Sequence, residues 1–186
     1  IPVHRLTRAH YVFDVIDTEE HVPTNQLTNL LHGTATTKAL LELAAKFSAK
    51  FLLASTVNVY HGFLSATSLD DYFGPGKSAS GDFFSHTKRI AESLTAEFYK
   101  HRQLDCRIIR LVDVYGPRMD LTGPSSLSRL LGSLRRGGPI QVSADGLAEH
   151  YPTFVTDAVE AIIKSMFTST SSGSIAKPVI FKDCSL

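Results

Sequence analysis

The chain has 186 residues, 43% of them hydrophobic and 20% charged, so it can bury one sizeable core but hardly two. Its 19 basic and 18 acidic residues nearly cancel, which excludes a net field that would favour nucleic acid or an anionic membrane as a partner. The longest apolar runs fall far short of the ~20 residues that span a bilayer. We therefore expect one globular domain that has no membrane span and binds no nucleic acid.

The two cysteines limit the kinds of site that the chain can form. Cys106 lies in an apolar run and Cys184 near the end of the chain, so they form neither a metal-binding spacing nor a disulfide framework. The sequence starts at Ile1 without the apolar stretch of a signal peptide, and we expect a processed or partial product. These features predict a protein of a reducing compartment, the cytoplasm, with no metal site.

Signals for strands and helices alternate along the chain. Short β-branched or apolar runs predict strands at residues 11–17, 51–55, 107–114, 139–143 and 177–182. Apolar positions at helical spacing predict helices at residues 27–47, 84–102, 125–136 and 155–167. Gly137 and Gly138 follow the third helix, as expected for a left-handed cap. This order predicts an α/β fold with a largely parallel sheet and helices on both faces.

Three segments carry chemistry-bearing side chains: residues 54–60 (ASTVNVY), 84–88 (FSHTK) and 110–119 (RLVDVYGPRM). Each segment alone has a simpler explanation, such as a turn cap at Ser55 and Thr56 or a solvated helix lysine at Lys88. In a parallel sheet, however, all three would deliver side chains to the carboxyl ends of the strands, where open α/β sheets bind ligands. We expect them to form one site.

Together and in this order, the segments resemble the extended short-chain dehydrogenase/reductase family, the NAD-dependent epimerases and dehydratases of sugar nucleotides. Residues 52–62 (LLASTVNVYHG), 110–119 and 133–146 (SLRRGGPIQVSADG) are most similar to UDP-glucuronate decarboxylases. The resemblance covers about residues 11–167 and implies a Rossmann-like sheet and bound NAD. Residues 1–186 would form a single partial NAD-binding domain with part of a C-terminal substrate lobe.

The resemblance implies roles for residues at the reacting centre. Thr56 matches the family's hydroxyl residue that hydrogen-bonds the reacting sugar hydroxyl, and Lys88 matches the lysine of its Tyr-x-x-x-Lys helix, which holds the nicotinamide ribose. Leu111 and Val112 match positions beside the cofactor. The tyrosine position holds Phe84, which has no proton to exchange, although general acid/base catalysis is worth ~10² to 10⁴ in rate. The sequence therefore predicts a severe catalytic defect.

The positions that match the family's substrate contacts also depart from its pattern. Asn58 replaces a glutamate of the decarboxylases, Asp113 replaces an asparagine before the Gly-Pro turn, and His150 replaces an arginine that binds the diphosphate. A histidine is at most partly charged near neutral pH, and an aspartate would face an anionic sugar nucleotide. Arg118 keeps the family's cationic contact. We expect these four residues to bind a UDP-sugar, if one binds.

The family opens with a glycine-rich strand-turn-helix that binds the pyrophosphate, and no such segment precedes residue 11. The sequence begins near the family's fourth strand, so we expect the N-terminal strands of the fold to be missing. Residues 17–20 (DTEE) place acids where the family has small residues beside the cofactor. NAD binding is therefore in question, and residues 11–17 would form an open sheet edge.

Two functions remain open from the sequence. The first is an NAD-dependent sugar-nucleotide enzyme, inactive or impaired as written, whose family reaction oxidises the sugar C4 hydroxyl, decarboxylates the resulting β-keto acid and reduces the ketone again. The second is a pseudoenzyme that serves as a binding or assembly module. The resemblance implies a homodimer through the helices at residues 27–47 and 84–102 in either case.

Overall fold

The structure is a computed structural model that describes residues 6–16, 26–60, 83–123, 126–140, 152–167 and 179–180. Two predictions fall elsewhere, since His150 and the acidic residues 17–20 lie outside the described residues. None of the helices in the described part is both long and apolar enough to cross a membrane.

A parallel sheet of four strands forms the centre of the described fold. Its strands run in the order β1-β2-β3-β6, at Tyr11–Asp14, Lys50–Thr56, Cys106–Leu111 and Val179–Ile180. Every neighbouring pair is parallel, with Phe13 opposite Leu52 and Leu53 opposite Ile108. The predicted α/β fold with a parallel sheet is confirmed.

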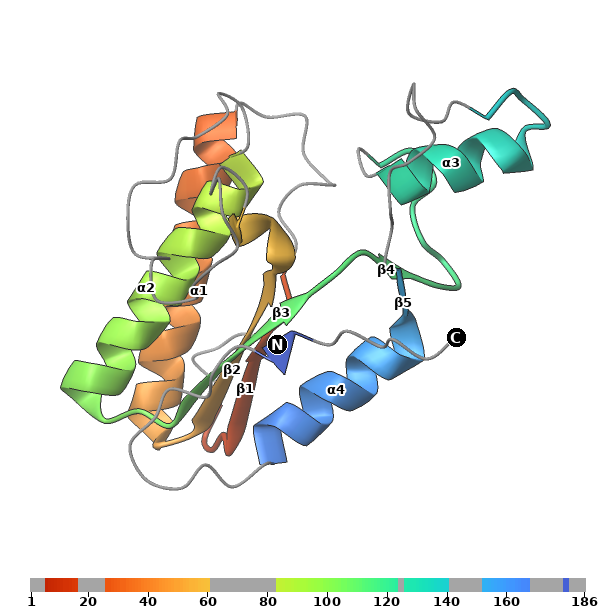
Figure 1. The fold of residues 1–186 in the computed structure, drawn as a ribbon. Helices are drawn as coiled ribbons and strands as arrows, with labels where there is room; N and C mark the ends of the chain where they lie inside the picture. Colours follow the sequence, from red (N-terminus) through yellow and green to blue (C-terminus); the bar gives the residue numbers. More distant parts are fainter. Residues whose placement is uncertain are drawn as a thin grey trace.

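Helices cover both faces of this sheet (Figure 1). On one face lie α1 (Gln26–Phe47) and α2 (Phe83–Arg102), side by side, and on the opposite face lies α4 (Val155–Phe167). Burial on both faces explains why β2 is a nearly continuous apolar run, with Phe51 through Ser55 all buried. A strand with one solvated face would alternate with polar residues instead.

Alternate residues of the central strands supply two separate cores. Phe51 and Leu53 point toward α1 and α2, where they pack with Leu41, Ala91 and Ile108. Leu52, Ala54 and Ile109 point the other way and pack with Ala161 and Met166 of α4. The period of two along each strand thus joins both helical layers to one sheet.

The helix α3 (Ser126–Arg135) ends as the sequence predicts. Gly137 adopts a left-handed conformation with φ of 67°, and the amide of Gly138 donates to the carbonyl oxygen of Ser133 over 3.0 Å. This is the αL termination that glycine permits at low steric cost.

The prediction of one continuous strand at residues 107–114 is wrong. The strand β3 ends at Leu111, and β4 (Val114–Tyr115) pairs in parallel with β5 (Thr153–Phe154) as a second, two-stranded sheet. The amide of Thr153 donates to the carbonyl oxygen of Asp113 over 2.8 Å, at the point where the chain passes from the main sheet to the second. Figure 1 shows β4, β5 and α3 beyond the end of that sheet.

Two further strand predictions are confirmed only in part or not at all within the described residues. Of the predicted strand at residues 139–143, residues 139 and 140 are described and are not in a strand. Of the strand predicted at residues 177–182, the structure describes Val179–Ile180 as β6.

The strand β1 lies at the end of the described sheet, where it hydrogen-bonds to β2 alone. Val12 and Asp14 are buried beneath α1, whereas Tyr11 and Phe13 are 45% and 37% exposed on the α4 side. The Tyr11 ring packs edge-on against the Phe167 ring, with centroids 5.0 Å apart. The predicted strand edge is thus open among the described residues.

Candidate functional site

The carboxyl end of β2 presents Thr56 and Asn58, two of the predicted site residues. A 3₁₀ turn, η2 (Val57–Tyr60), starts immediately after the strand. The amide of Asn58 donates to Oγ1 of Thr56 over 3.2 Å, so the threonine side chain caps this turn. The turn cap expected as the simpler explanation is present, and it holds the Thr56 hydroxyl at the end of the strand.

Lys88 is a buried residue of α2 and not a solvated helix lysine. Only 8% of Lys88 is exposed. Its Nζ donates to the carbonyl oxygen of Ile16 over 2.9 Å and to that of Ala54 over 3.0 Å. Ile16 follows β1, and Ala54 lies two residues before Thr56 in β2. Lys88 and Thr56 therefore lie at the same end of the sheet, as the sequence predicts.

Phe84 lies one turn before Lys88 on α2. The centroid of its ring is 5.8 Å from Nζ of Lys88, and the side chain is half-buried. Residues four apart on a helix share a face, which explains this approach. The ring offers apolar surface and a cation contact to the lysine but no ionisable group.

The end of β3 brings two more predicted residues to this region. Leu111 is the residue opposite Thr56 in the parallel register, and Val112 follows it directly. Asp113 is exposed, and its described contact is the main-chain hydrogen bond to Thr153. The predicted cofactor positions thus lie beside Thr56, while Asp113 marks the start of the second sheet.

A cavity of about 390 Å³ lies where the second sheet meets α3. Its lining includes two arginines, two aromatic rings and two apolar side chains: Arg118, Arg135, Tyr115, Phe154, Met119 and Leu131. The Tyr115 and Phe154 rings meet edge-on with centroids 5.4 Å apart. The cavity therefore combines positive charge with apolar and aromatic surface.

The turn at residues 116–119 shapes this cavity. The amide of Met119 donates to the carbonyl oxygen of Gly116 over 3.2 Å, and Arg118 has a left-handed φ of 68°. A Cβ atom on Gly116 would lie 2.5 Å from Cγ1 of Val155, so only glycine allows the turn to approach α4 this closely. The turn places the exposed Arg118 at the cavity.

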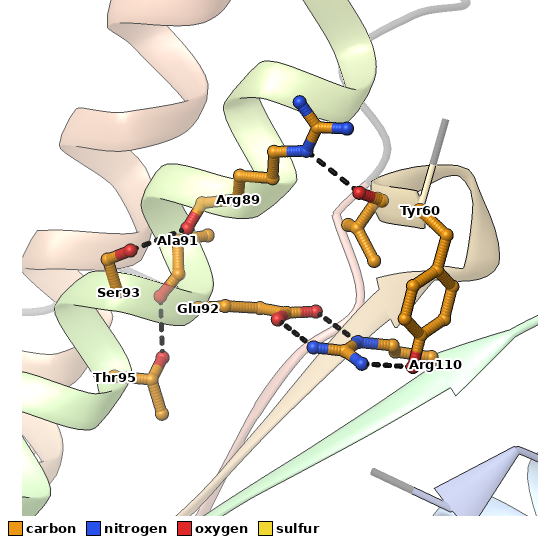
Figure 2. Close-up of polar contacts among 8 residues, drawn as sticks. Tyr60, Arg89, Ala91, Glu92, Ser93, Thr95 and Arg110 are labelled. Carbon is orange, nitrogen blue, oxygen red and sulfur yellow. Dashed lines mark hydrogen bonds and ion pairs between the residues drawn. The ribbon is translucent and has the colours of Figure 1, made fainter. Parts of the chain in front are cut away.

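A buried polar network beside the site was not predicted from the sequence (Figure 2). Arg110 of β3 pairs with Glu92 of α2 and donates to the hydroxyl of Tyr60, and Arg89 donates to the carbonyl oxygen of Val59. The available signal was an arginine inside an apolar strand, since a buried charge requires a partner.

Asp14 is a further buried acidic residue, outside the segments that the sequence indicates as functional. The hydroxyl of Thr37 donates to its carboxylate over 2.7 Å, and the amide of Ile16 donates to it over 3.4 Å. Ile16 in turn offers its carbonyl oxygen to Lys88. Asp14 thus shapes the backbone that receives the lysine.

Cys106 lies in the core, and its thiol is poorly suited to act as a nucleophile. Burial raises the pKa of its thiol from 9.0 to about 12, with a further increase from the charge of Asp105 and a smaller opposing effect of Arg107. Among the residues that the structure describes, no group of three His, Cys, Asp or Glu side chains could hold a metal ion.

The chain matches the model of the NAD dependent epimerase/dehydratase family over residues 3–175, nearly its whole length. The chain belongs to this family. Among curated relatives, it is 30% identical over 159 residues to UDP-glucuronic acid decarboxylase 4 of Arabidopsis thaliana, a match that covers 85% of the chain. It is 27% identical over 152 residues to UDP-glucuronic acid decarboxylase 1 of Xenopus tropicalis. These matches cover 33% and 35% of the two relatives, so the chain spans about a third of their length.

Solved structures of the epimerase/dehydratase fold are similar to the chain. UDP-N-acetylglucosamine 4-epimerase from Methanobrevibacter ruminantium matches with a TM-score of 0.74 at 17% identity, over 92% of this chain and 56% of that one. UDP-glucuronic acid 4-epimerase from Bacillus cereus, in complex with NAD, matches with a TM-score of 0.67 at 22% identity, over 86% and 49% of the two chains. The Rossmann-like fold predicted from the family resemblance is confirmed.

Within this family member, the structure brings Thr56, Asn58, Phe84, Lys88 and Leu111 to one end of the main sheet. It places Arg118 at a separate cavity beside the second sheet. The predicted site residues at the strand ends and the charged cavity are thus supplied by different segments of the chain.

Proposed function

We propose that the chain binds a UDP-sugar in the manner of the UDP-glucuronic acid decarboxylases and turns it over poorly or not at all. One observation carries this proposal: Lys88 and Thr56 converge at the strand ends, while the position one turn before Lys88 holds the phenyl ring of Phe84. In this proposal the family's acid/base is the one group that the strand ends lack. Loss of such a group costs ~10² to 10⁴ in rate.

The residues at the strand ends fit the nicotinamide end of NAD. Lys88 would hold the ribose, and Leu111 and Val112 would lie beside the nicotinamide ring. Bound NAD would supply a hydride acceptor for the carbon that bears the sugar C4 hydroxyl. Thr56 would donate to or accept from that hydroxyl, but Phe84 could not remove its proton.

The cavity beside the second sheet is the place we propose for the nucleotide part of the sugar nucleotide. Arg118 and Arg135 supply two cations suited to phosphate oxygens, and Tyr115 and Phe154 supply aromatic surface. Asn58 and Asp113 would contact the sugar nucleotide outside this cavity, and His150 would add a further polar contact. In this proposal residues 1–186 form a partial NAD-binding domain with part of the substrate lobe.

A solved structure of this fold contains a tyrosine-to-phenylalanine change and two bound ligands. A tyrosine-to-phenylalanine mutant of UDP-glucuronic acid 4-epimerase from Bacillus cereus, 21% identical to this chain with a TM-score of 0.73, has been solved with NAD and a fluorinated UDP-sugar. This supports the proposal that a member of this fold can lose a tyrosine hydroxyl and still bind a UDP-sugar and NAD.

Calorimetric titration with UDP-glucuronic acid, in the presence and absence of NAD, tests the proposal. We expect saturable binding of the UDP-sugar, no detectable product, and about tenfold weaker binding for Arg118→Gln because a charge-assisted contact is lost. The control Arg129→Gln removes an exposed arginine of α3 that does not line the cavity. Rapid turnover by the unmodified chain, or equal affinity of both variants, would contradict the proposal.

The second candidate is a pseudoenzyme that serves as an assembly module. The observation in its favour is exposed apolar surface on the paired helices, where Leu27 and Leu31 of α1 are 51% and 61% exposed and Ile90 of α2 is 38% exposed. Such surface suits a homodimer through α1 and α2. Absence of saturable binding below millimolar ligand, together with a dimer that Leu31→Glu dissociates in light scattering, would favour this candidate over the first.

A further inference from the structure

A buried ion pair joins α2 to β3 beside the proposed reaction centre (Figure 2). The guanidinium of Arg110 donates from Nε and Nη2 to the two carboxylate oxygens of Glu92, over 2.9 and 2.6 Å. Only 5% of the Arg110 side chain and 4% of the Glu92 side chain are exposed. Two parallel hydrogen bonds fix the direction of the guanidinium plane as well as its place.

Arg110 directs its remaining edge at Tyr60. Its Nη1 donates to the phenolic oxygen of Tyr60, and its Cζ lies 4.8 Å from the centroid of the Tyr60 ring. Tyr60 is the last residue of η2, the turn that begins directly after Thr56. The ion pair is therefore connected to the segment that carries the predicted site residues.

A second arginine holds the same turn from α2. Nε of Arg89 donates to the carbonyl oxygen of Val59 over 2.8 Å, and Arg89 is the residue next to Lys88. At the start of the turn, Thr56 accepts the hydrogen bond from the amide of Asn58. The turn is thus tied to the same helix that presents Phe84 and Lys88.

Stability alone is a weak reason for a charged pair at this place. Removing two charges from water offsets much of their attraction, and apolar residues of similar volume often replace such a pair without loss. An apolar core containing Leu53, Ala91 and Ile108 already joins α2 to the sheet. Apolar residues could not, however, hold the hydroxyl of Tyr60, so the charges act on the turn.

We propose that Glu92, Arg110 and Tyr60 are positioning residues that hold η2, and with it Thr56 and Asn58, against a bound sugar nucleotide. Glu92 orients Arg110, Arg110 holds the Tyr60 hydroxyl, and Tyr60 fixes the end of the turn. The identity of the ligand rests on the function proposed above, whereas the fixing of the turn does not.

Tyr60→Phe tests the proposal because it removes one hydroxyl and leaves the ring and the fold in place. We expect the amides of residues 57–60 to exchange hydrogen about tenfold faster, as loss of one hydrogen bond implies. The matched control, Tyr99→Phe, removes the hydroxyl of a half-buried tyrosine of α2 that lies away from η2. It should leave the exchange of these amides unchanged. Unchanged exchange at residues 57–60 in Tyr60→Phe would overturn the proposal.

Glu92→Gln tests the orienting step. It removes the charge that fixes Arg110 and should also accelerate exchange at residues 57–60. Its control, Glu42→Gln, removes the acid of an ion pair with Lys38 in which the Glu42 and Lys38 side chains are 55% and 57% exposed. This control should not change exchange at residues 57–60. If Glu92→Gln fails to fold, Tyr60→Phe still decides the question.

Titration with UDP-glucuronic acid separates this proposal from the proposed function. Binding about tenfold weaker in Tyr60→Phe than in Tyr99→Phe would support both. Equal affinities would overturn the link between the turn and the ligand. If the unmodified chain binds no UDP-sugar, the proposed function falls, and the exchange rates alone decide whether these residues fix the turn.

Discussion

The ammonium group of Lys88 donates to the main-chain carbonyl oxygen of Ala54 over 3.0 Å, inside the protein. A second bond reaches the carbonyl oxygen of Ile16, so one helix side chain joins the carboxyl ends of β1 and β2. A lysine that the family resemblance assigns to cofactor binding therefore also supports the fold.

We expect Lys88→Met to lower the free energy of unfolding by about 2 kcal/mol, because two carbonyl oxygens lose their charged donor. Lys38→Met is the matched control, since it breaks an exposed pair with Glu42 and should cost less than about 0.5 kcal/mol. Urea unfolding of both variants measures the difference. Equal losses would show that the buried lysine contributes nothing beyond an ordinary helix residue.

Phe84→Tyr should introduce a phenol whose pKa lies below the ordinary value of about 10. The cause is the Lys88 ammonium, which lies 5.8 Å from the centroid of the present ring and favours a phenolate nearby. Ultraviolet titration of the new phenol measures this pKa, and adding Lys88→Met should raise it again. If the ligands bind, turnover should rise by at least ~10², the usual contribution of an acid/base.

Gly116→Ala should destabilise the protein by about 1 to 3 kcal/mol, a cost typical of overpacking. Its Cβ atom would lie 2.5 Å from Cγ1 and 3.0 Å from Cβ of Val155 at the start of α4. At Gly138 a Cβ atom would meet only the carbonyl oxygen of Ser133 at 3.7 Å, so Gly138→Ala is the control and should be nearly neutral. Thermal unfolding of the two variants compares them, and similar midpoints would count against this packing.

Cys106 should make stability fall at alkaline pH. Between pH 9 and 12 the unfolded chain loses the thiol proton while the folded chain keeps it, because the folded pKa is about 12. Over that range the loss amounts to about 4 kcal/mol, whereas below it the thiol contributes no pH dependence. Denaturant unfolding gives the free energy of unfolding of the native chain and of Cys106→Ala at each pH. Plotted against pH, the two free energies should converge as pH rises. Curves that stay parallel would contradict the raised pKa.

The parts of the fold that sequence predicts well are those with an unambiguous period or cap. The amphipathic helix at residues 155–167 and the strand around Phe51 agree closely with α4 and β2. The division between β3 and β4 was not predicted, because Val112 and Val114 are both β-branched strand formers and a single polar residue between them, Asp113, fits an alternating strand as well as a strand end. The strand β3 ends where its partner β2 ends, with Leu111 opposite Thr56, and beyond it Asp113 accepts a hydrogen bond from Thr153, which is distant in sequence.

The candidate site shows the same division. The four-residue spacing of Phe84 and Lys88, together with the family resemblance, is enough to place them on one face of a helix. The bonds from Lys88 to Ile16 and from Arg110 to Glu92 depend on how the helix lies against the sheet. Such contacts are tertiary, and periodicity within a segment contains no information about them.

The strands β4 and β5 are far apart in the sequence but pair with each other, with Val114 opposite Thr153. Because β4 and β5 pair with each other and with neither β2 nor β3, substitutions in the sequence between them would leave the hydrogen bonds of the main sheet intact. Sequence changes between β4 and β5 would therefore be tolerated without disturbing the main sheet, as is common for connections on a rigid scaffold.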